Sequence, residues 1–210
     1  MYKYIVFDVD GTLIDTERAI IASLKRVLKE AGVEKEFSDK DLTFVLGIPG
    51  AASLSQLGIE DIDSALVKWN RYMKDYSSYI NIFPGVEAVV SQLKDRGISL
   101  GVVTSKTREE LEYDFVPYGL AKHMDHMICA DDTENHKPHP DPILKFIEKA
   151  QVDPAQLIYI GDTPYDCQCA REAGVKFGLA LWGAQGPGNM ECEYIFSKPE
   201  DIINTLFCID

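Results

Sequence analysis

The residues with the clearest chemical potential are two carboxylates that follow the first apolar run of the chain. Residues 4–7 are apolar or aromatic, Asp8 follows them directly, and Asp10 comes two residues later. Alternate side chains of an extended backbone point the same way, so the two acids share one face. Gly11 permits a sharp turn that brings backbone N–H groups close to a ligand. Paired acids at a strand end predict a site where a cation, a proton or a substrate group relieves their repulsion.

This stretch also has two simpler interpretations, a solvated turn and a calcium-binding loop. An Asp-x-Asp-Gly sequence also occurs in solvated turns and in calcium loops. A calcium-binding EF-hand loop that begins at Asp8 would need Glu at its twelfth position, where this chain has Ala19. The calcium loop is therefore excluded, and the solvated turn stays open on this stretch alone.

Further polar residues follow three other predicted strands. They are Thr104, Ser105 and Lys106 after residues 98–103, Lys137 in a loop after residues 127–130, and Asp162 with Asp166 after residues 157–160. Each could singly be a helix cap or a solvated side chain. Together they all fall at the carboxyl ends of strands, which is the edge where α/β sheets bind ligands. Acids with a lysine and a hydroxyl at one edge indicate a Mg²⁺ and phosphate site.

The elements that must position these residues follow from the spacing of apolar positions. From residue 83 onward, predicted strands and helices alternate, which is typical of a parallel sheet with helices on both faces. Residues 16–81 show helical spacing and no strand pattern. We therefore predict an α/β fold with a Rossmann-like core over 1–15 and 82–210 and an inserted α-helical cap over 16–81. Ser197 is the expected N-cap of the last helix, with Pro199 in its first turn.

Composition narrows the class of partner. The formal net charge is −13, which opposes binding to nucleic acid or to an anionic membrane surface. No apolar run approaches the length of a membrane span, and no signal peptide is visible at the start of this sequence. Five cysteines without Cys-x-x-Cys spacing favour reduced thiols and a cytoplasmic location. We expect a small phosphorylated metabolite as partner, no nucleic acid, no membrane, and a monomer or weak dimer.

The combined pattern resembles a known family. Residues 8–13 (DVDGTL), Thr104-Ser105, Lys137-Pro138 and the Gly161-Asp162-x-x-x-Asp166 stretch resemble, in order, the four motifs of the haloacid dehalogenase (HAD) superfamily. The helical insert directly after the first motif resembles the cap of its phosphoglycolate-phosphatase-like and β-phosphoglucomutase-like branch. The resemblance implies an enzyme that hydrolyses a small phosphate monoester with Mg²⁺.

The resemblance also implies a role for each matched residue. Asp8 would be the nucleophile that forms an aspartyl-phosphate, and Asp10 the general acid and then the base. Mg²⁺ would be held by Asp8, the Asp10 carbonyl and Asp162, with Asp166 as a ligand through water or as support. The phosphate oxygens would be bound by Gly11, Thr104, Ser105 and Lys137.

Three alternatives and the substrate stay open at this point. A β-phosphoglucomutase-like mutase is disfavoured because no histidine lies between residues 1 and 122, and a true haloacid dehalogenase would lack Asp10. A non-catalytic phosphate-binding module is the third. The cap offers few groups that could bind an anion. Arg18, Lys25 and Arg71 are candidates, although a solvated charge on a helix face is the simpler interpretation of each. We expect the loop at Gly47, together with Arg18, to influence substrate choice.

Overall fold

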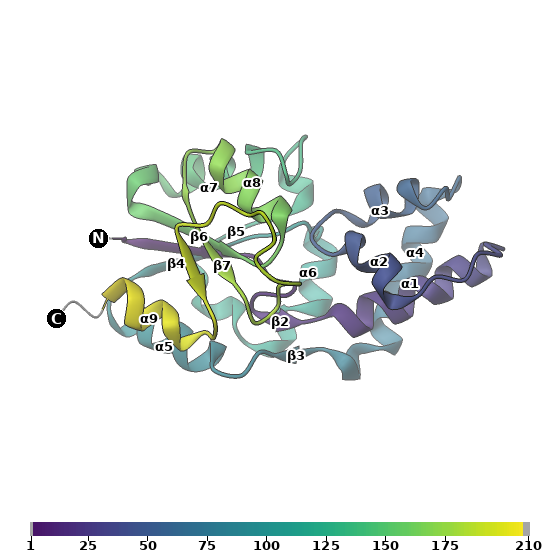
Figure 1. Cartoon of the computed structure of the whole chain (residues 1–210), viewed down its shortest axis with the longest axis horizontal. Helices are drawn as coiled ribbons and strands as arrows, with labels where there is room; N and C mark the ends of the chain where they lie inside the picture. Colours follow the sequence, from purple (N-terminus) through teal and green to yellow (C-terminus); the bar gives the residue numbers. More distant parts are fainter. Residues whose placement is uncertain (1, 208–210) are drawn as a thin grey trace.

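A six-stranded, all-parallel sheet forms the centre of the molecule in the computed structural model, which describes residues 2–207 (Figure 1). Its strands are β1 (Tyr4–Phe7), β4 (Ser99–Val103), β5 (His126–Ile128), β6 (Leu157–Gly161), β7 (Lys176–Ala180) and β8 (Tyr194–Phe196). They lie in the order β5-β4-β1-β6-β7-β8. This confirms the predicted fold class.

The position of β1 between β4 and β6 decides where a ligand can bind. Tyr4 pairs with Ser99 on one side and with Leu157 on the other. The chain runs outward from β1 through β4 to β5, and then returns to the opposite side of β1 for β6, β7 and β8. The carboxyl end of β1, just before Asp8, is therefore the point where strand order reverses, which is the usual ligand site of open α/β sheets.

Both faces of the sheet are covered because β1 is apolar on both. Ile5 and Phe7 pack into one buried core and Val6 into the other. Helices α5 (Val86–Asp95) and α9 (Glu200–Phe207) cover one face, and α7 (Asp141–Ala150) and α8 (Pro164–Glu172) the opposite face (Figure 1). The short helix α6 (Arg108–Asp114) follows β4.

The predicted start of the last helix was wrong. Helix α9 begins at Glu200, so Ser197 is not its N-cap and Pro199 precedes its first residue. Instead, the Asp201 carboxylate accepts hydrogen bonds from the backbone N–H groups of Ser197 and Lys198 at 3.0 and 3.2 Å. An acid inside the first turn thus satisfies the N–H groups of the two residues that precede Pro199.

The segment between residues 16 and 81 is helical, as predicted, and extends away from the sheet (Figure 1). Its helices are α1 (Glu17–Glu30), α2 (Asp39–Leu42), α3 (Gly50–Gln56) and α4 (Ile62–Asp75). Ser38 and Asp41 form a capping box at the start of α2, as their three-residue spacing indicates. The buried indole of Trp69 on α4 donates to Ser23 Oγ on α1 at 2.9 Å, which ties the two longest helices together. The division into core and cap stays our interpretation of this arrangement.

A two-stranded antiparallel ribbon connects the cap to the sheet, and it was not predicted. It consists of β2 (Ile14–Asp15) and β3 (Asn81–Ile82). Two residues are too few to show an alternating pattern, so such strands are visible only in the fold. The ribbon brings the two ends of the cap segment side by side, which leaves the cap one narrow connection to the core.

Short 3₁₀ turns complete the structure. They lie at Thr43–Val45, Ser77–Tyr79, Val116–Tyr118, Ala121–His123, Ala130–Asp132 and Pro154–Gln156. Over residues 2–207, none of the helices combines the length and the apolar character that crossing a bilayer requires.

Candidate active site

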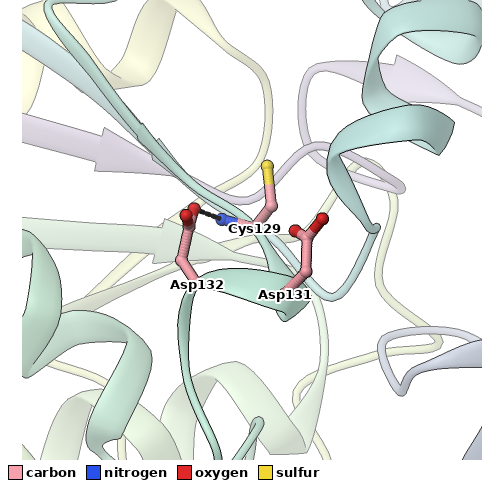
Figure 2. Close-up of side chains that lie close together, drawn as sticks. All are labelled: Cys129, Asp131 and Asp132. Atoms are coloured by element: carbon pink, nitrogen blue, oxygen red, sulfur yellow. Dashed lines mark hydrogen bonds between the residues drawn. The ribbon is translucent and has the colours of Figure 1, made fainter.

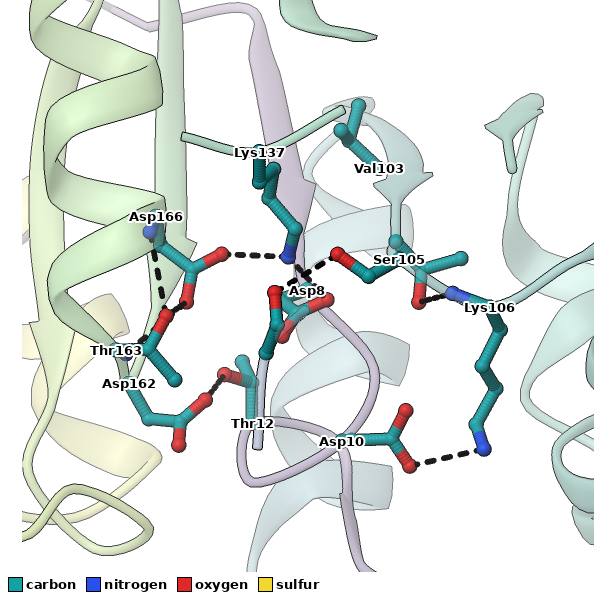
Figure 3. A network of polar contacts seen from close by, with 12 residues as sticks. Asp8, Asp10, Thr12, Val103, Ser105, Lys106, Lys137, Asp162, Thr163 and Asp166 are labelled. Carbon is teal, nitrogen blue, oxygen red and sulfur yellow. Dashed lines mark hydrogen bonds and ion pairs between the residues drawn. The ribbon is translucent and has the colours of Figure 1, made fainter. Parts of the chain in front are cut away.

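Three carboxylates from separate parts of the chain meet at the end of β1 (Figure 3). Asp8 follows β1, Asp162 follows β6, and Asp166 lies in the first turn of α8. One carboxylate oxygen from each lies within 4.8 Å of the others, and all three residues are buried. Had the carboxylates of Asp8 and Asp162 faced different sides of the molecule, a shared cation would have been impossible. We call these three residues the buried acid group.

A buried lysine balances part of this negative charge. Lys137 Nζ lies 3.0 Å from Asp8 Oδ1 and 2.6 Å from Asp166 Oδ1. It also donates to the Tyr159 hydroxyl at 3.3 Å. Only 3% of Lys137 is exposed, so its charge is directed to these partners instead of to solvent. The structure therefore brings the loop lysine to the acids that follow β1 and β6.

Asp166 and Asp162 are bound in different ways. Asp166 accepts from the Thr163 backbone N–H at 3.0 Å, from Thr163 Oγ1 at 2.6 Å and from the Tyr159 hydroxyl at 3.0 Å. Asp162 accepts from Thr12 Oγ1 at 3.1 Å. The lone pairs of Asp166 are thus largely occupied by the protein, whereas those of Asp162 remain available for a ligand.

Burial makes the charged form of these acids costly. Burial raises the pKa of Asp8 to about 7, against the lowering effect of Lys137. Burial, with the neighbouring Asp166 and Asp8 carboxylates, also raises the pKa of Asp162 well above its ordinary value. A buried cluster of oxygen donors with excess negative charge matches what a hard divalent cation such as Mg²⁺ requires. The residues present therefore fit a divalent cation.

Asp10 lies beside the buried acid group and has its own partners. The Thr16 hydroxyl donates to Asp10 Oδ1 at 2.6 Å, and Lys106 Nζ lies 3.2 Å from the same oxygen. Lys106 also pairs with Asp114 at 3.0 Å. The Asp10 side chain is 16% exposed, unlike the fully covered Asp8, so it lies where the site opens. Its carboxylate is held by the first residue before α1 and by the loop after β4.

Gly11 is required by close packing at the turn after Asp10. Its φ is +77°, in the left-handed region that favours glycine. A Cβ there would lie 2.2 Å from Asp162 Oδ2. Any larger residue would displace one of the three buried acids, so the glycine of the motif has a steric role, while its backbone N–H donates to the Ile14 carbonyl at 2.9 Å.

The two hydroxyl residues after β4 lie at the same edge. Thr104 is buried, and its Oγ1 accepts from the Lys106 backbone N–H at 3.2 Å. Ser105 Oγ donates to the Gly47 carbonyl of the cap at 2.8 Å. Together with Asp8 and Asp10, both residues line a pocket between the core and the cap. Gly47 borders the pocket too, and its influence on substrate choice stays a prediction.

Arg18 is not brought to this pocket. Its guanidinium lies 3.7 Å from the centre of the Tyr79 ring and lines a separate surface hollow together with Lys25. Arg71, the third cationic candidate, is exposed on α4 and does not line the pocket. Side chains that point away from the core cannot be distinguished from those that point toward it by residue type alone.

Sequence reasoning missed several residues that position the site. Thr16 and Lys106 hold Asp10, Tyr159 holds Asp166, and the Trp182 indole donates to the Thr12 carbonyl at 2.9 Å. The available signal for Lys106 was its position two residues after Thr104. Tyr159 carries no such signal, because a tyrosine inside an apolar strand normally indicates packing.

A second acidic group lies at the end of β5 and is built differently (Figure 2). Cys129, Asp131 and Asp132 offer ligand atoms within 4.8 Å of one another. However, Asp132 accepts from the Cys129 backbone N–H at 2.8 Å and pairs with Arg108 Nη2 at 2.6 Å. Asp131 accepts from the Arg108 backbone N–H at 3.0 Å. These acids therefore act as caps for local N–H groups.

Fold and site together define an α/β enzyme in which a helical insert covers an acidic site at the carboxyl edge of a parallel sheet. The family model of the haloacid dehalogenase-like hydrolases matches residues 5–180. The chain belongs to this family.

Similarity to known proteins extends over nearly the full length of the chain. The chain is 28% identical to a phosphoglycolate phosphatase of Aquifex aeolicus over 207 residues, which is 97% of this chain and 96% of the relative. It is 27% identical to the pyrophosphatase PpaX of Oceanobacillus iheyensis, over 96% of this chain and 95% of the relative. A crystal structure of a protein from Lactobacillus plantarum superposes with a TM-score of 0.89 at 33% identity, over 97% of this chain and 99% of the other.

Proposed function

We propose that this protein is a Mg²⁺-dependent phosphatase that hydrolyses a small phosphate monoester through an aspartyl-phosphate on Asp8. The observation that carries the proposal is the surrounding of Asp8. Its carboxylate lies 3.0 Å from Lys137, within 4.8 Å of two further carboxylates, and at the edge of a pocket that the cap closes. The names of the curated relatives, a phosphoglycolate phosphatase and a pyrophosphatase, support phosphoester or phosphoanhydride hydrolysis.

In the first step, an oxygen of Asp8 would attack phosphorus, and the bond from phosphorus to the leaving oxygen would break. A carboxylate nucleophile divides a difficult transfer into two easier ones. Lys137 is placed to bind a phosphate oxygen, because it already contacts the attacking carboxylate. The Thr104 hydroxyl and the backbone N–H of Ser105, which follow β4 and line the same pocket, would be further donors for the phosphate oxygens.

Asp10 would move the protons. It would give a proton to the leaving oxygen in the first step and take one from the attacking water in the second, which frees Asp8 and releases phosphate. Thr16 and Lys106 fix the direction of this carboxylate at 2.6 and 3.2 Å. Because Thr16 directly precedes α1, the position of the cap and that of the proton carrier are linked.

The buried acid group would hold the cation. Asp8, Asp162 and the backbone carbonyl of Asp10 are the ligands that we propose, and Asp166 would position Lys137 or bind through water. When bound, Mg²⁺ would neutralise the acids and the phosphate oxygens so that one anion can approach another. The acids of the protein supply the orientation.

One observation bears on the alternative of a sugar-phosphate mutase. No histidine lines the pocket among residues 2–207, which favours hydrolysis over phosphoryl transfer to a sugar by a mutase.

The cysteines support a location for the enzyme. Four free thiols, those of Cys129, Cys167, Cys169 and Cys192, fit a reducing, cytoplasmic compartment.

The test is phosphate release from an aryl phosphate with and without Mg²⁺. The wild-type protein should release phosphate only with the metal, and Asp10→Asn should accumulate acid-stable label on Asp8 from a ³²P-labelled substrate, because hydrolysis of the intermediate loses its base. Asp131→Asn, in the second acidic group, is the control and should retain activity. Absence of release from a broad phosphoester panel would favour the non-catalytic binding module.

A further inference from the structure

The pocket between cap and core has an uneven distribution of charge that bears on the substrate. We call its part beyond Asp10 the leaving-group pocket, because an ester whose phosphorus lies at Asp8 would place its alcohol there. The cap supplies the apolar side chains of Ile20, Val45, Ile48, Trp69 and Met73 to the pocket. The core supplies Lys106, Glu110 and Asp114.

The polar atoms of Trp69 and Met73 in this pocket already have partners. The Trp69 N–H donates to Ser23 Oγ at 2.9 Å, and the same hydroxyl lies 3.1 Å from Met73 Sδ. Asn70 is the one polar side chain that the cap contributes to the lining within residues 2–207. It is neutral, so the cap side offers apolar surface and an amide but no cation.

Among residues 2–207, Lys106 is the one cation that lines the pocket, and its charge is already neutralised. It is buried and pairs with Asp10 at 3.2 Å and with Asp114 at 3.0 Å. The lining also contains Glu110, whose carboxylate accepts from the Thr107 backbone N–H at 2.7 Å. A second anion on the substrate would therefore face two carboxylates, Glu110 and Asp114, and a lysine whose charge is already matched. Like charges without a free counter-ion are strongly unfavourable in a partly buried site.

We infer that the preferred substrate is a phosphate monoester whose leaving alcohol carries no negative charge and has an apolar body. This inference rests on the proposed phosphatase function and specifies its substrate class. It separates this chain from the substrates in the names of its relatives, since glycolate and phosphate are both anionic leaving groups. Esters of neutral or amine-bearing alcohols fit the apolar cap surface and the acidic core side.

A matched set of three esters tests this inference. Propyl phosphate, phosphoethanolamine and 2-phosphoglycolate are similar in size and differ in leaving-group charge. We expect kcat/KM for 2-phosphoglycolate, and for pyrophosphate, to be at least about tenfold below that for propyl phosphate, which corresponds to one unfavourable charge contact. A preference for 2-phosphoglycolate or pyrophosphate would overturn the inference.

Substitutions at the pocket sharpen the test. Asn70→Arg adds a cation to the cap side and should raise the ratio of kcat/KM for 2-phosphoglycolate over propyl phosphate by about tenfold or more. Glu110→Gln, which retains a side chain able to cap α6, should raise the same ratio in the same direction. Val67→Arg places the same charge on the solvent face of α4, where Val67 is 72% exposed, and should leave the ratio unchanged. Unchanged ratios in both Asn70→Arg and Glu110→Gln would contradict the inference.

Binding separates this inference from the proposed function. Calorimetric titration of Asp8→Asn with Mg²⁺ and each ester reports charge preference without turnover. If propyl phosphate binds more tightly than 2-phosphoglycolate while the wild-type protein hydrolyses neither, the phosphatase proposal fails and the charge preference stands. If 2-phosphoglycolate binds more tightly, or no ester binds, the charge preference is wrong.

Discussion

The two acidic groups of this protein contain similar residues and have opposite surroundings. The buried acid group, Asp8, Asp162 and Asp166, has its three side chains removed from solvent and shares a single lysine (Figure 3). In the second group, Asp131 and Asp132 are exposed and accept local backbone N–H bonds (Figure 2). Carboxylates in the same strand-end position thus either meet in a buried group around one lysine or accept hydrogen bonds from local backbone N–H groups. Burial and the supply of local donors decide between the two outcomes.

Activity should show the largest difference between the groups. Asp8→Asn removes the proposed nucleophile and should lower kcat by roughly 10⁴-fold or more, as losses of a nucleophile typically do. Asp131→Asn should leave kcat within about twofold, because Asp131 contacts only the exposed start of α6. Steady-state phosphate release measures both. Equal losses in the two variants would show that the groups are not functionally distinct.

The second-largest difference between the two acidic groups should be the stability lost when the cationic partner is removed. Lys137→Met leaves Asp8 and Asp166 without their cation inside the protein and should cost about 3–5 kcal/mol in the free energy of unfolding. Arg108→Met removes the partner of the partly exposed Asp132 and should cost at most about 1 kcal/mol. Urea unfolding at pH 8 in EDTA measures both changes. If Lys137→Met and Arg108→Met lowered the free energy of unfolding by similar amounts, the difference in burial between the two groups would not explain their stability.

The stability of the metal-free protein should depend on pH because of Asp8. Its pKa is raised by burial from 3.8 to about 7, so between these values the folded state binds more protons than the unfolded state. Stability in EDTA should therefore fall as pH rises from 3.8 to about 7, and added Mg²⁺ should raise the melting temperature more at pH 8 than at pH 5.5.

Two variants show which groups cause the fall in melting temperature between pH 3.8 and about 7. Asp8→Asn should flatten the fall in melting temperature, because it removes the proton that the folded state retains. Asp131→Asn should keep the wild-type slope. A slope that survives in Asp8→Asn would place its origin at other groups, such as Asp162, whose pKa burial also raises.

The smallest effect is expected at the contact between cap and core, outside both groups. Gly47 has a φ of +89°, and a Cβ there would lie 2.8 Å from Thr163 Cγ2. Gly47→Ala should therefore cost about 1–2 kcal/mol of left-handed strain and open the cap slightly. We expect a raised KM and an altered ranking of substrates, with Mg²⁺-dependent stabilisation retained. An unchanged ranking across a phosphoester panel would exclude Gly47 from substrate selection.

Much of the core could be predicted because its signals are local. Residues 4–7 predict a buried strand from their composition, and Ser38 with Asp41 predicts a capped helix from their spacing. The ribbon of β2 and β3 could not be predicted, because two-residue strands exist only through their pairing. The start of α9 was misplaced for a related reason, since the Asp201 carboxylate accepts from the backbone N–H groups of Ser197 and Lys198, and only the folded backbone brings these groups together.

The sequence by itself determined the residue types and order of the catalytic motifs, because acids, glycine and lysine carry their chemistry wherever they lie in the fold. Only the tertiary structure decided which charges neutralise one another. Lys106 pairs with Asp10 and Asp114, Arg18 stacks on Tyr79 away from the pocket, and Tyr159 reaches Asp166 across the site. Electrostatic interactions depend on distance and burial, and both are properties of the packed chain.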